Sequence, residues 1–438
     1  MKSLGNDHRK YSISNLGNSE ADRVEFMINN MNKNKAYLYE SNKLQNENDK
    51  TRLLDIYKEK FLKYRRGWRS IPANAIKNKL HSDQLINEEI FPLCIDLEVA
   101  SVCDLACPHC YRQYIATPDK LMTKDLAFKL IDQLAELKVP SVKFNWRGEP
   151  LMNTKLPEII DYAKQNGVLE TIINTNATYL KGDYAEELIS SGLDLLIYSF
   201  DGGSKKTYDK YRVGRFKENK FEDVFDNIKN FHHLKKKKNS LFPRTKIQMV
   251  LTKETYEEQN EYFKLFKDIV DDVSVKQYTE RGGEIKETEI NNYKLDKDSI
   301  VMKNFDGDLF VSKGRLPCEQ PFQRMLVTYD GRVSMCCYDW GSMHPVGYVD
   351  DLAFKIGDHE YKKIKKKADD KKRGFELMNL ELPKKFNQPE KKISTLKEIW
   401  HGNEINQVRK HHVENNLEKI TICQKCPFKD TYDWKKIN

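Results

Sequence analysis

The segment from residue 91 to about residue 280 alternates short apolar runs with longer amphipathic runs, and this alternation most restricts the fold. Six runs have the length and side chains of strands, and the runs between them have helical periodicity. Strands that alternate with helices of this length predict a parallel sheet with right-handed crossovers, and six units could close into a partial barrel. The expected strands are residues 94–99, 141–145, 169–174, 193–199, 245–251 and 273–278, with helices near residues 123–138, 156–166, 183–191, 219–235 and 254–268.

The loop after the first strand holds three cysteines with the spacing C-x3-C-x2-C: Cys103, Cys107 and Cys110. In barrels of this kind the chemistry gathers on loops after the carboxyl ends of the strands. Three thiolates on one loop can hold three corners of a cubane iron–sulfur cluster, which leaves the fourth iron open for a small ligand. A structural zinc site, with His109 as a fourth ligand, is the alternative. A disulfide is not expected, because nine cysteines is an odd count and the N-terminus has no apolar signal region.

This triple-cysteine spacing after a first strand resembles the signature of the radical S-adenosylmethionine (radical SAM) superfamily. An aromatic residue usually precedes the third cysteine in that family, whereas this chain has His109. The resemblance implies a [4Fe–4S] cluster on Cys103, Cys107 and Cys110, with S-adenosylmethionine at the open iron. It also implies that one electron, from a flavodoxin- or ferredoxin-type donor, splits the cofactor into methionine and a 5′-deoxyadenosyl radical, which takes a hydrogen atom from the substrate.

Three further loops resemble the family's cofactor-binding motifs and follow in the same order. Residues 147–150 are similar to G-G-E-P, with Arg147 in place of the first glycine, and residues 175–177 are similar to T-N-G, with Ala177 at the glycine position. Residues 199–202 are similar to S-x-D-G, and a tyrosine and an arginine follow. Taken alone, such loops are also ordinary strand-to-helix turns. The cofactor contacts that the resemblance implies are Gly148, Glu149, Thr175, Asn176, Ser199 and Arg212, with Gln248 and Val250 near the adenine or the substrate.

A second group of cysteines lies near the C-terminus, where Cys318, Gly331 and Cys336 have the spacing C-x12-G-x4-C and Cys423 and Cys426 form a C-x2-C pair. This pattern resembles the SPASM or shorter "twitch" domain that follows many radical SAM barrels. The resemblance implies one auxiliary [4Fe–4S] cluster on the four cysteines, because no cysteine follows Cys426. A zinc ribbon with the same four thiols fits this tail equally well, and the first motif favours iron–sulfur.

Two cysteines are left over. Cys94 lies inside an expected strand and is interpreted as a buried small hydrophobe. Cys337 could replace a cluster ligand or give a hydrogen atom to a substrate radical, as a cysteine does in some epimerases of the family, and it is the candidate catalytic residue.

The predicted fold class is therefore α/β: a partial (β/α)6 radical SAM barrel with an N-terminal helical extension and a small C-terminal α+β auxiliary-cluster domain. Residues 1–88 are polar, with helical patches at residues 20–31 and 51–68 that we expect to pack over the barrel. The barrel is expected over residues 89–285 and the auxiliary-cluster domain over residues 286–438.

Charge and hydropathy restrict the partners. Lysine and arginine number 75 against 66 acidic residues, a formal net charge of +9, which fits a solvated surface or a patch for an acidic substrate or a reduced electron donor. Nucleic acid is not expected, because the lysine-rich runs at residues 235–238 and 362–373 have few interleaved aromatics. No apolar stretch reaches about 18 residues, so no membrane span is expected, and reduced cysteines fit a cytoplasmic protein.

The expected function is that of a radical SAM enzyme, an oxidoreductase or an isomerase. Oxidation or epimerisation of a polar small molecule, such as a sugar or nucleotide-sugar, is favoured by the single auxiliary site and the absence of a recognisable peptide-binding module. Modification of a ribosomally made peptide or protein is the first alternative, because auxiliary-cluster domains often serve peptide maturases. A zinc-bound interaction protein without catalytic activity is the second.

Overall fold

A computed structural model describes residues 12–14, 20–81, 91–110, 112, 117–277, 300–303, 309–312, 315–342, 344–354, 389–424, 426, 428 and 431–436. The lysine-rich run at residues 362–373 and the end of the sixth expected strand, residue 278, lie outside these ranges. Of the helices that the structure describes, none combines the length and the apolar character needed to cross a membrane.

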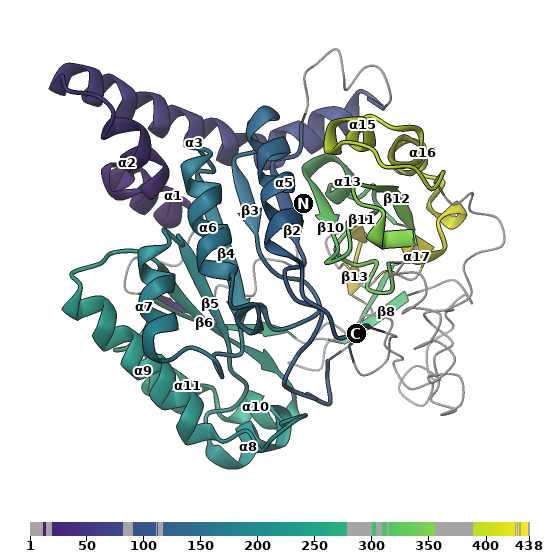
Figure 1. Ribbon diagram of the computed structural model, residues 1–438. Coiled ribbons are helices and arrows are strands. Elements are labelled where there is room, and N and C mark those ends of the chain that lie inside the picture. The colour runs from purple at the N-terminus through teal and green to yellow at the C-terminus, as the bar shows by residue number, and fades with distance from the viewer. Residues whose placement is uncertain are drawn as a thin grey trace.

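A ten-stranded sheet organises the molecule in the order β1-β7-β6-β5-β4-β3-β2-β10-β11-β12 (Figure 1). Its six central neighbours from β2 to β7 pair in parallel, which confirms the predicted partial barrel. They are β2 (Cys94–Leu97), β3 (Ser141–Lys143), β4 (Glu170–Thr175), β5 (Leu195–Ser199), β6 (Arg244–Leu251) and β7 (Asp272–Gln277). Each overlaps the strand that the hydrophobic pattern predicts.

Crossover helices cover one face of this sheet (Figure 1). Alternate strand residues such as Ile95, Leu97 and Val142 are fully buried against the apolar sides of these helices. The residues between them point to the opposite face of the sheet. The helices are α5 (Lys124–Glu136), α6 (Leu156–Gln165), α7 (Gly182–Ser190), α8 (Lys205–Tyr211), α9 (Phe221–Lys237), α10 (Lys253–Glu257) and α11 (Gln259–Phe266), after the short η4 (Pro150–Met152).

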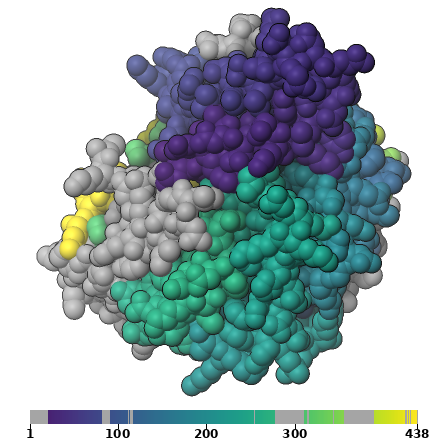
Figure 2. Space-filling view, turned by 90° about the vertical axis from the view of Figure 1, so that its left-hand side faces the viewer, coloured from purple at the N-terminus to yellow at the C-terminus, as the bar shows by residue number. Residues whose placement is uncertain are grey.

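The N-terminal helices pack on the barrel where its strands begin, opposite the loops that carry the motifs (Figures 1 and 2). Glu170, the first residue of β4, receives Arg23 as an ion pair and the hydroxyl of Tyr64 at 3.0 Å. Buried Asn34 donates to Asp194, just before β5, at 2.9 Å. The extension comprises β1 (Ser12–Ser14), α1 (Glu20–Asn29), η2 (Met31–Lys33), α2 (Lys35–Ser41) and α3 (Glu47–Lys77).

The C-terminal part continues the barrel sheet instead of forming a separate layer. β10 (Arg324–Val327) pairs in parallel with β2, and a hairpin then adds β11 (Arg332–Ser334) and β12 (Pro345–Tyr348). The expected boundary near residue 285 is therefore crossed by one hydrogen-bonded sheet. Around it lie a second sheet of β8 (Ile300–Lys303), β9 (Leu309–Ser312) and β13 (Lys435–Lys436), and α13 (Gln320–Gln323), α15 (Leu396–Trp400), α16 (Asn403–Val413), η6 (Leu417–Lys419) and α17 (Thr421–Gln424).

Candidate cluster and cofactor site

The three-cysteine loop leaves β2 at the carboxyl edge of the sheet. Cys107 is buried, whereas Cys103 and Cys110 are half-buried. Burial raises the pKa of the Cys107 thiol to about 12, although nearby Arg212 opposes the shift. Binding to iron would compensate the cost of removing that proton. Among the described residues no three acidic, histidine or cysteine side chains converge on a point where one metal ion could lie; thiolates around a cubane instead bind separate irons.

Gly148 presses directly against the start of the cysteine loop. A Cβ at this position would lie 2.3 Å from the carbonyl oxygen of Val102 and 2.4 Å from that of Ala100, so no larger residue fits. The next amide, of Glu149, donates to the same Val102 oxygen at 2.8 Å. The loop after β3 is therefore joined to the cysteine loop through the backbone.

Glu149 connects the loop after β3 to the loop after β4. Its carboxylate accepts from the hydroxyl of Thr175 at 2.6 Å and from the amide of Asn176 at 2.7 Å, and it also accepts from Leu151 at 3.0 Å. Burial, together with nearby Asp104, raises the pKa of Glu149 to about 8. A positively charged ligand group placed here would favour the ionised carboxylate.

Asp104, which lies between the first two cysteines, holds the loop after β4 through hydrogen bonds to two of its side chains. Its carboxylate accepts from the side-chain amide (Nδ2) of Asn176 at 2.8 Å and from the hydroxyl of Thr178 at 2.7 Å. Between them Ala177 is fully buried with φ of 64°, so it adopts the left-handed conformation that a glycine would take there. The exchange of glycine for alanine therefore leaves this turn in the glycine-type conformation.

Arg212 lies beside the cysteine loop and forms an ion pair with Asp201 at 2.6 Å. Its guanidinium also approaches the Cys107 sulfur at 4.0 Å, and His109 contacts the same Asp201 at 3.2 Å. Burial alone would raise the pKa of Asp201, but Arg212 and His109 overcome this and bring it to about 2. Ser199 ends β5 in register with Gln248 of β6, on the sheet face turned away from the crossover helices.

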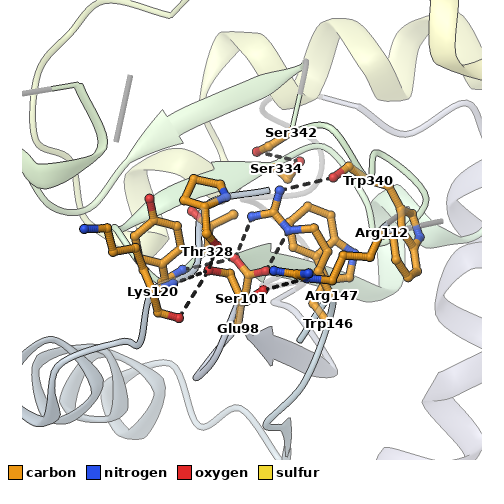
Figure 3. A network of polar contacts seen from close by, with 12 residues as sticks. Glu98, Ser101, Arg112, Lys120, Trp146, Arg147, Thr328, Ser334, Trp340 and Ser342 are labelled. Atoms are coloured by element: carbon orange, nitrogen blue, oxygen red, sulfur yellow. Dashed lines mark hydrogen bonds and ion pairs between the residues drawn. The ribbon is translucent and has the colours of Figure 1, made fainter. Parts of the chain in front are cut away.

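A buried ion pair fixes the base of the loop after β3 (Figure 3). Arg147 donates through Nε and Nη2 to the two oxygens of Glu98, each at 2.7 Å, and both side chains have no exposed surface. Its Nη1 reaches the carbonyl of Trp340 at 3.2 Å, and neighbouring Trp146 donates to the carbonyl of Cys337 at 3.0 Å. The residue that replaces a glycine thus ties the barrel to the C-terminal hairpin.

The structure brings the four C-terminal cysteines together: one cavity is lined by Cys318, Cys336, Cys423 and Cys426. His412 of α16 lines it as well and is neutral, because burial lowers its pKa to about 3. The Cys318 amide donates to its Nδ1 at 3.0 Å, so the ring proton belongs on Nε2, which lies 3.6 Å from the Cys423 sulfur. Four thiols around one cavity, with an N–H group aimed at a sulfur, fit an iron–sulfur cluster.

Cys337 is not among the residues that line this cavity, although it follows Cys336 directly. Its thiol lies 3.7 Å from the side-chain oxygen of Gln320. Cys94 is buried in β2, in agreement with its structural interpretation.

Comparison with known families agrees with this arrangement. Residues 97–266 match the family model of the radical SAM superfamily, and residues 318–374 match that of the SPASM iron–sulfur cluster-binding domain. The chain therefore belongs to the radical SAM superfamily and carries a C-terminal SPASM domain. These domains imply a [4Fe–4S] cluster, S-adenosylmethionine and auxiliary iron–sulfur.

Curated relatives match only a part of the chain. The Fe-coproporphyrin III synthase of Methanosarcina barkeri is 38% identical over 112 residues, which are 25% of this chain and 27% of the relative. A probable GTP 3′,8-cyclase of Methanococcus maripaludis is 33% identical over 119 residues, 27% of this chain and 39% of the relative. The matched segment thus spans between a quarter and two fifths of these relatives.

Solved structures with a similar fold include BtrN in complex with AdoMet and 2-DOIA, at 17% identity and a TM-score of 0.42, covering 77% of this chain and 93% of BtrN. Another is SuiB of Streptococcus suis bound to the precursor peptide SuiA, at 17% identity and a TM-score of 0.44, covering 73% of this chain and 70% of SuiB.

Asp104 and His412 are not among the site residues expected from the sequence, and Asp201 is included there only as part of the S-x-D-G motif. Asp104, Asp201 and His412 each hold a predicted site residue through a contact between segments far apart in the chain. Asp104 offered the best clue, since a carboxylate between two cysteines is well placed to fix their loop.

Proposed function

We propose that this protein uses a cluster on Cys103, Cys107 and Cys110 to cleave S-adenosylmethionine, and that it oxidises or epimerises a polar small molecule such as a sugar or nucleotide-sugar. The observation that carries the first part is the convergence of separate loops on the cysteine loop. Gly148 packs on its backbone, and Asn176 bonds to Asp104 within it. The bound cluster and cofactor would supply a 5′-deoxyadenosyl radical for hydrogen-atom abstraction.

The protein's own residues would bind and orient the cofactor. Glu149 offers a buried carboxylate to an ammonium group, and Arg212 offers a guanidinium to a carboxylate. Thr175 and Asn176 hold Glu149 in place from the next strand, and Ser199 presents a hydroxyl at the end of β5. These groups suit the two charges of an amino acid that reaches the open corner of a cluster.

A small-molecule substrate is supported by two considerations. The names of the curated relatives refer to a nucleotide and a porphyrin, both small molecules. The described N-terminal helices pack against the amino ends of the strands, away from the cysteine loop, so they contribute no surface beside it for a peptide. Modification of a peptide or protein remains the alternative outcome of the substrate test.

The test uses protein reconstituted with iron and sulfide without oxygen, then reduced with dithionite. We expect a cubane absorption band and formation of 5′-deoxyadenosine and methionine. Nucleotide-sugars should increase that formation, and an epimerisation in D₂O should place deuterium in the product if Cys337 returns the hydrogen atom, because thiol hydrogens exchange with solvent. Protein that lacks the band and never forms 5′-deoxyadenosine would refute the proposal; turnover only with a peptide would establish the alternative.

The auxiliary site gives a separate prediction. Replacing Cys423 by alanine is expected to remove about four of roughly eight irons per chain, because one iron of the auxiliary cubane would lose its thiolate ligand and the cluster would become labile. The matched control is Cys337→Ala, which changes the cysteine next to a proposed ligand but lies outside the cavity lining. Iron and zinc are counted by mass spectrometry. An unchanged iron count in Cys423→Ala, or an equal loss in Cys337→Ala, would contradict the assignment.

A further inference from the structure

A basic corner lies on the face of the sheet turned away from the crossover helices, where β2 runs between β3 and β10. Lys143 of β3 is the register partner of Asp96 of β2, and Arg324 of β10 is the partner of Cys94. Arg324 also forms an ion pair with Asp96 at 3.1 Å. Because Val142 and Ile95 are buried on the helix side, Lys143 and Asp96 point to this opposite face.

The corner has hydrogen-bonding groups that its neighbours leave unused. Within the part of the chain that the structure describes, Lys143 has no hydrogen-bond or ion-pair partner. Among the described residues, the Nε of Arg324 finds no acceptor, and Oδ1 of Asp96, a residue only 2% exposed, finds no donor. Lys143 and Arg324 are half-buried and Asp96 is buried, so the corner is recessed. Two cations face one carboxylate here, so the described residues leave one positive charge of the corner unpaired.

Cys337 lies at the same corner. Its sulfur contacts the side-chain oxygen of Gln320, four residues before Arg324, at 3.7 Å. A negative charge on Cys337 would raise the pKa of both Lys143 and Arg324. The Trp146 indole, which follows β3, holds its carbonyl at 3.0 Å. Cys337 is half-buried, so its side chain has access to solvent. The candidate hydrogen donor therefore lies between the basic corner and the auxiliary cavity, because Gln320 also lines that cavity.

We propose that the corner of Lys143, Arg324 and Asp96 binds an anionic, hydroxylated group of the substrate, a phosphate or a carboxylate, beside Cys337. The ammonium and the free guanidinium N–H would donate to the anion, and Asp96 would accept from a hydroxyl. This inference rests on the proposed function and narrows its substrate to an anion. Burial lowers the pKa of Lys143 and Asp96 offsets this only in part, so a bound anion would stabilise the charged lysine.

The test uses Cys337 as a reporter in the full-length, cluster-loaded protein without oxygen. Its alkylation rates by iodoacetate, an anion, and by neutral iodoacetamide are measured by peptide mass spectrometry. The rate with iodoacetate is divided by the rate with iodoacetamide, and this ratio is then divided by the same ratio for glutathione. The intrinsic reactivity of the thiol cancels, so the normalised ratio reports how strongly the site attracts an anion. We expect the normalised ratio to exceed one, and Lys143→Gln to lower it roughly three- to tenfold, as expected for loss of one nearby, partly screened charge. Lys246→Gln, a half-buried lysine on the same face of β6, is the matched control and should leave the ratio unchanged.

The compounds that protect Cys337 from alkylation identify which kind of anion the corner binds. Glucose 1-phosphate should slow alkylation if the site takes phosphates, glucuronate if it takes carboxylates, and glucose should slow it least. A ratio that Lys143→Gln does not change, equal protection by all three, or a Cys337 that neither reagent labels would overturn the proposal. None of these measurements requires cofactor cleavage, so failure here is distinct from failure of the proposed function.

Discussion

Replacing Cys107 by alanine is expected to reduce 5′-deoxyadenosine formation by more than about a hundredfold, since even outer-shell changes at metal sites cost about 10–100-fold. Cys107 is the buried member of the triplet and the one that the Arg212 guanidinium approaches. A cluster with two thiolates would be lost or misplaced, so the iron content should fall by about four per chain as well. The measurement is chromatography of the nucleoside after reduction, with iron determined on the same sample.

Cys94→Ala is the matched control for this experiment. Cys94 is also a buried cysteine, only thirteen positions before Cys107, but it lies within β2 and not in the cysteine loop. We expect that variant to keep its iron and to cleave the cofactor at close to the unsubstituted rate. Undiminished cleavage by Cys107→Ala would reject the ligand assignment, and equal losses in both variants would point to a general effect on folding.

The barrel could be predicted because its signal is repeated and local. Every strand from β2 to β7 alternates buried residues with residues of the opposite face, and the intervening helices have their own apolar period. The cysteine spacing then identified which end of the sheet carries the chemistry. The auxiliary cysteines could be grouped for a similar reason, since a hairpin turn at Gly331, with φ of 87°, brings Cys318 and Cys336 near each other.

The contacts that join these parts could not be predicted, because they depend on neighbours that only the complete fold brings together. Nothing in the sequence of β10 indicates that it pairs with β2. Arg147 was visible only as a departure from a glycine motif, and its partner Glu98 stands 49 positions earlier. No periodicity in the sequence reveals which of two distant charged residues will pair. Most charged residues are exposed, so a buried pair such as Glu98 and Arg147 is not the default expectation. These long-range contacts place the candidate cofactor loops and the auxiliary cavity within one molecule.

Arg147→Met is expected to lower the free energy of unfolding by about 3–5 kcal/mol, because it leaves the buried Glu98 carboxylate without its cation. The double variant Glu98→Leu/Arg147→Met should recover much of the loss, since it removes the stranded charge too. Lys155→Met is the control: Lys155 pairs with Glu158 at 2.7 Å, but both side chains are about half exposed, and solvent screening leaves such pairs little effect on stability. Urea denaturation of the full chain measures all three.

The pH dependence of Arg147→Met distinguishes a stranded charge from simple loss of packing. Burial already raises the pKa of Glu98, and without Arg147 that increase is unopposed. The folded variant then holds a proton that the unfolded chain releases above about pH 4.3, the ordinary glutamate value. Its stability relative to the unsubstituted protein should therefore fall as the pH rises from 4 to 8. A deficit that is the same at every pH, or smaller than that of Lys155→Met, would show that the Glu98–Arg147 pair does not hold this junction together.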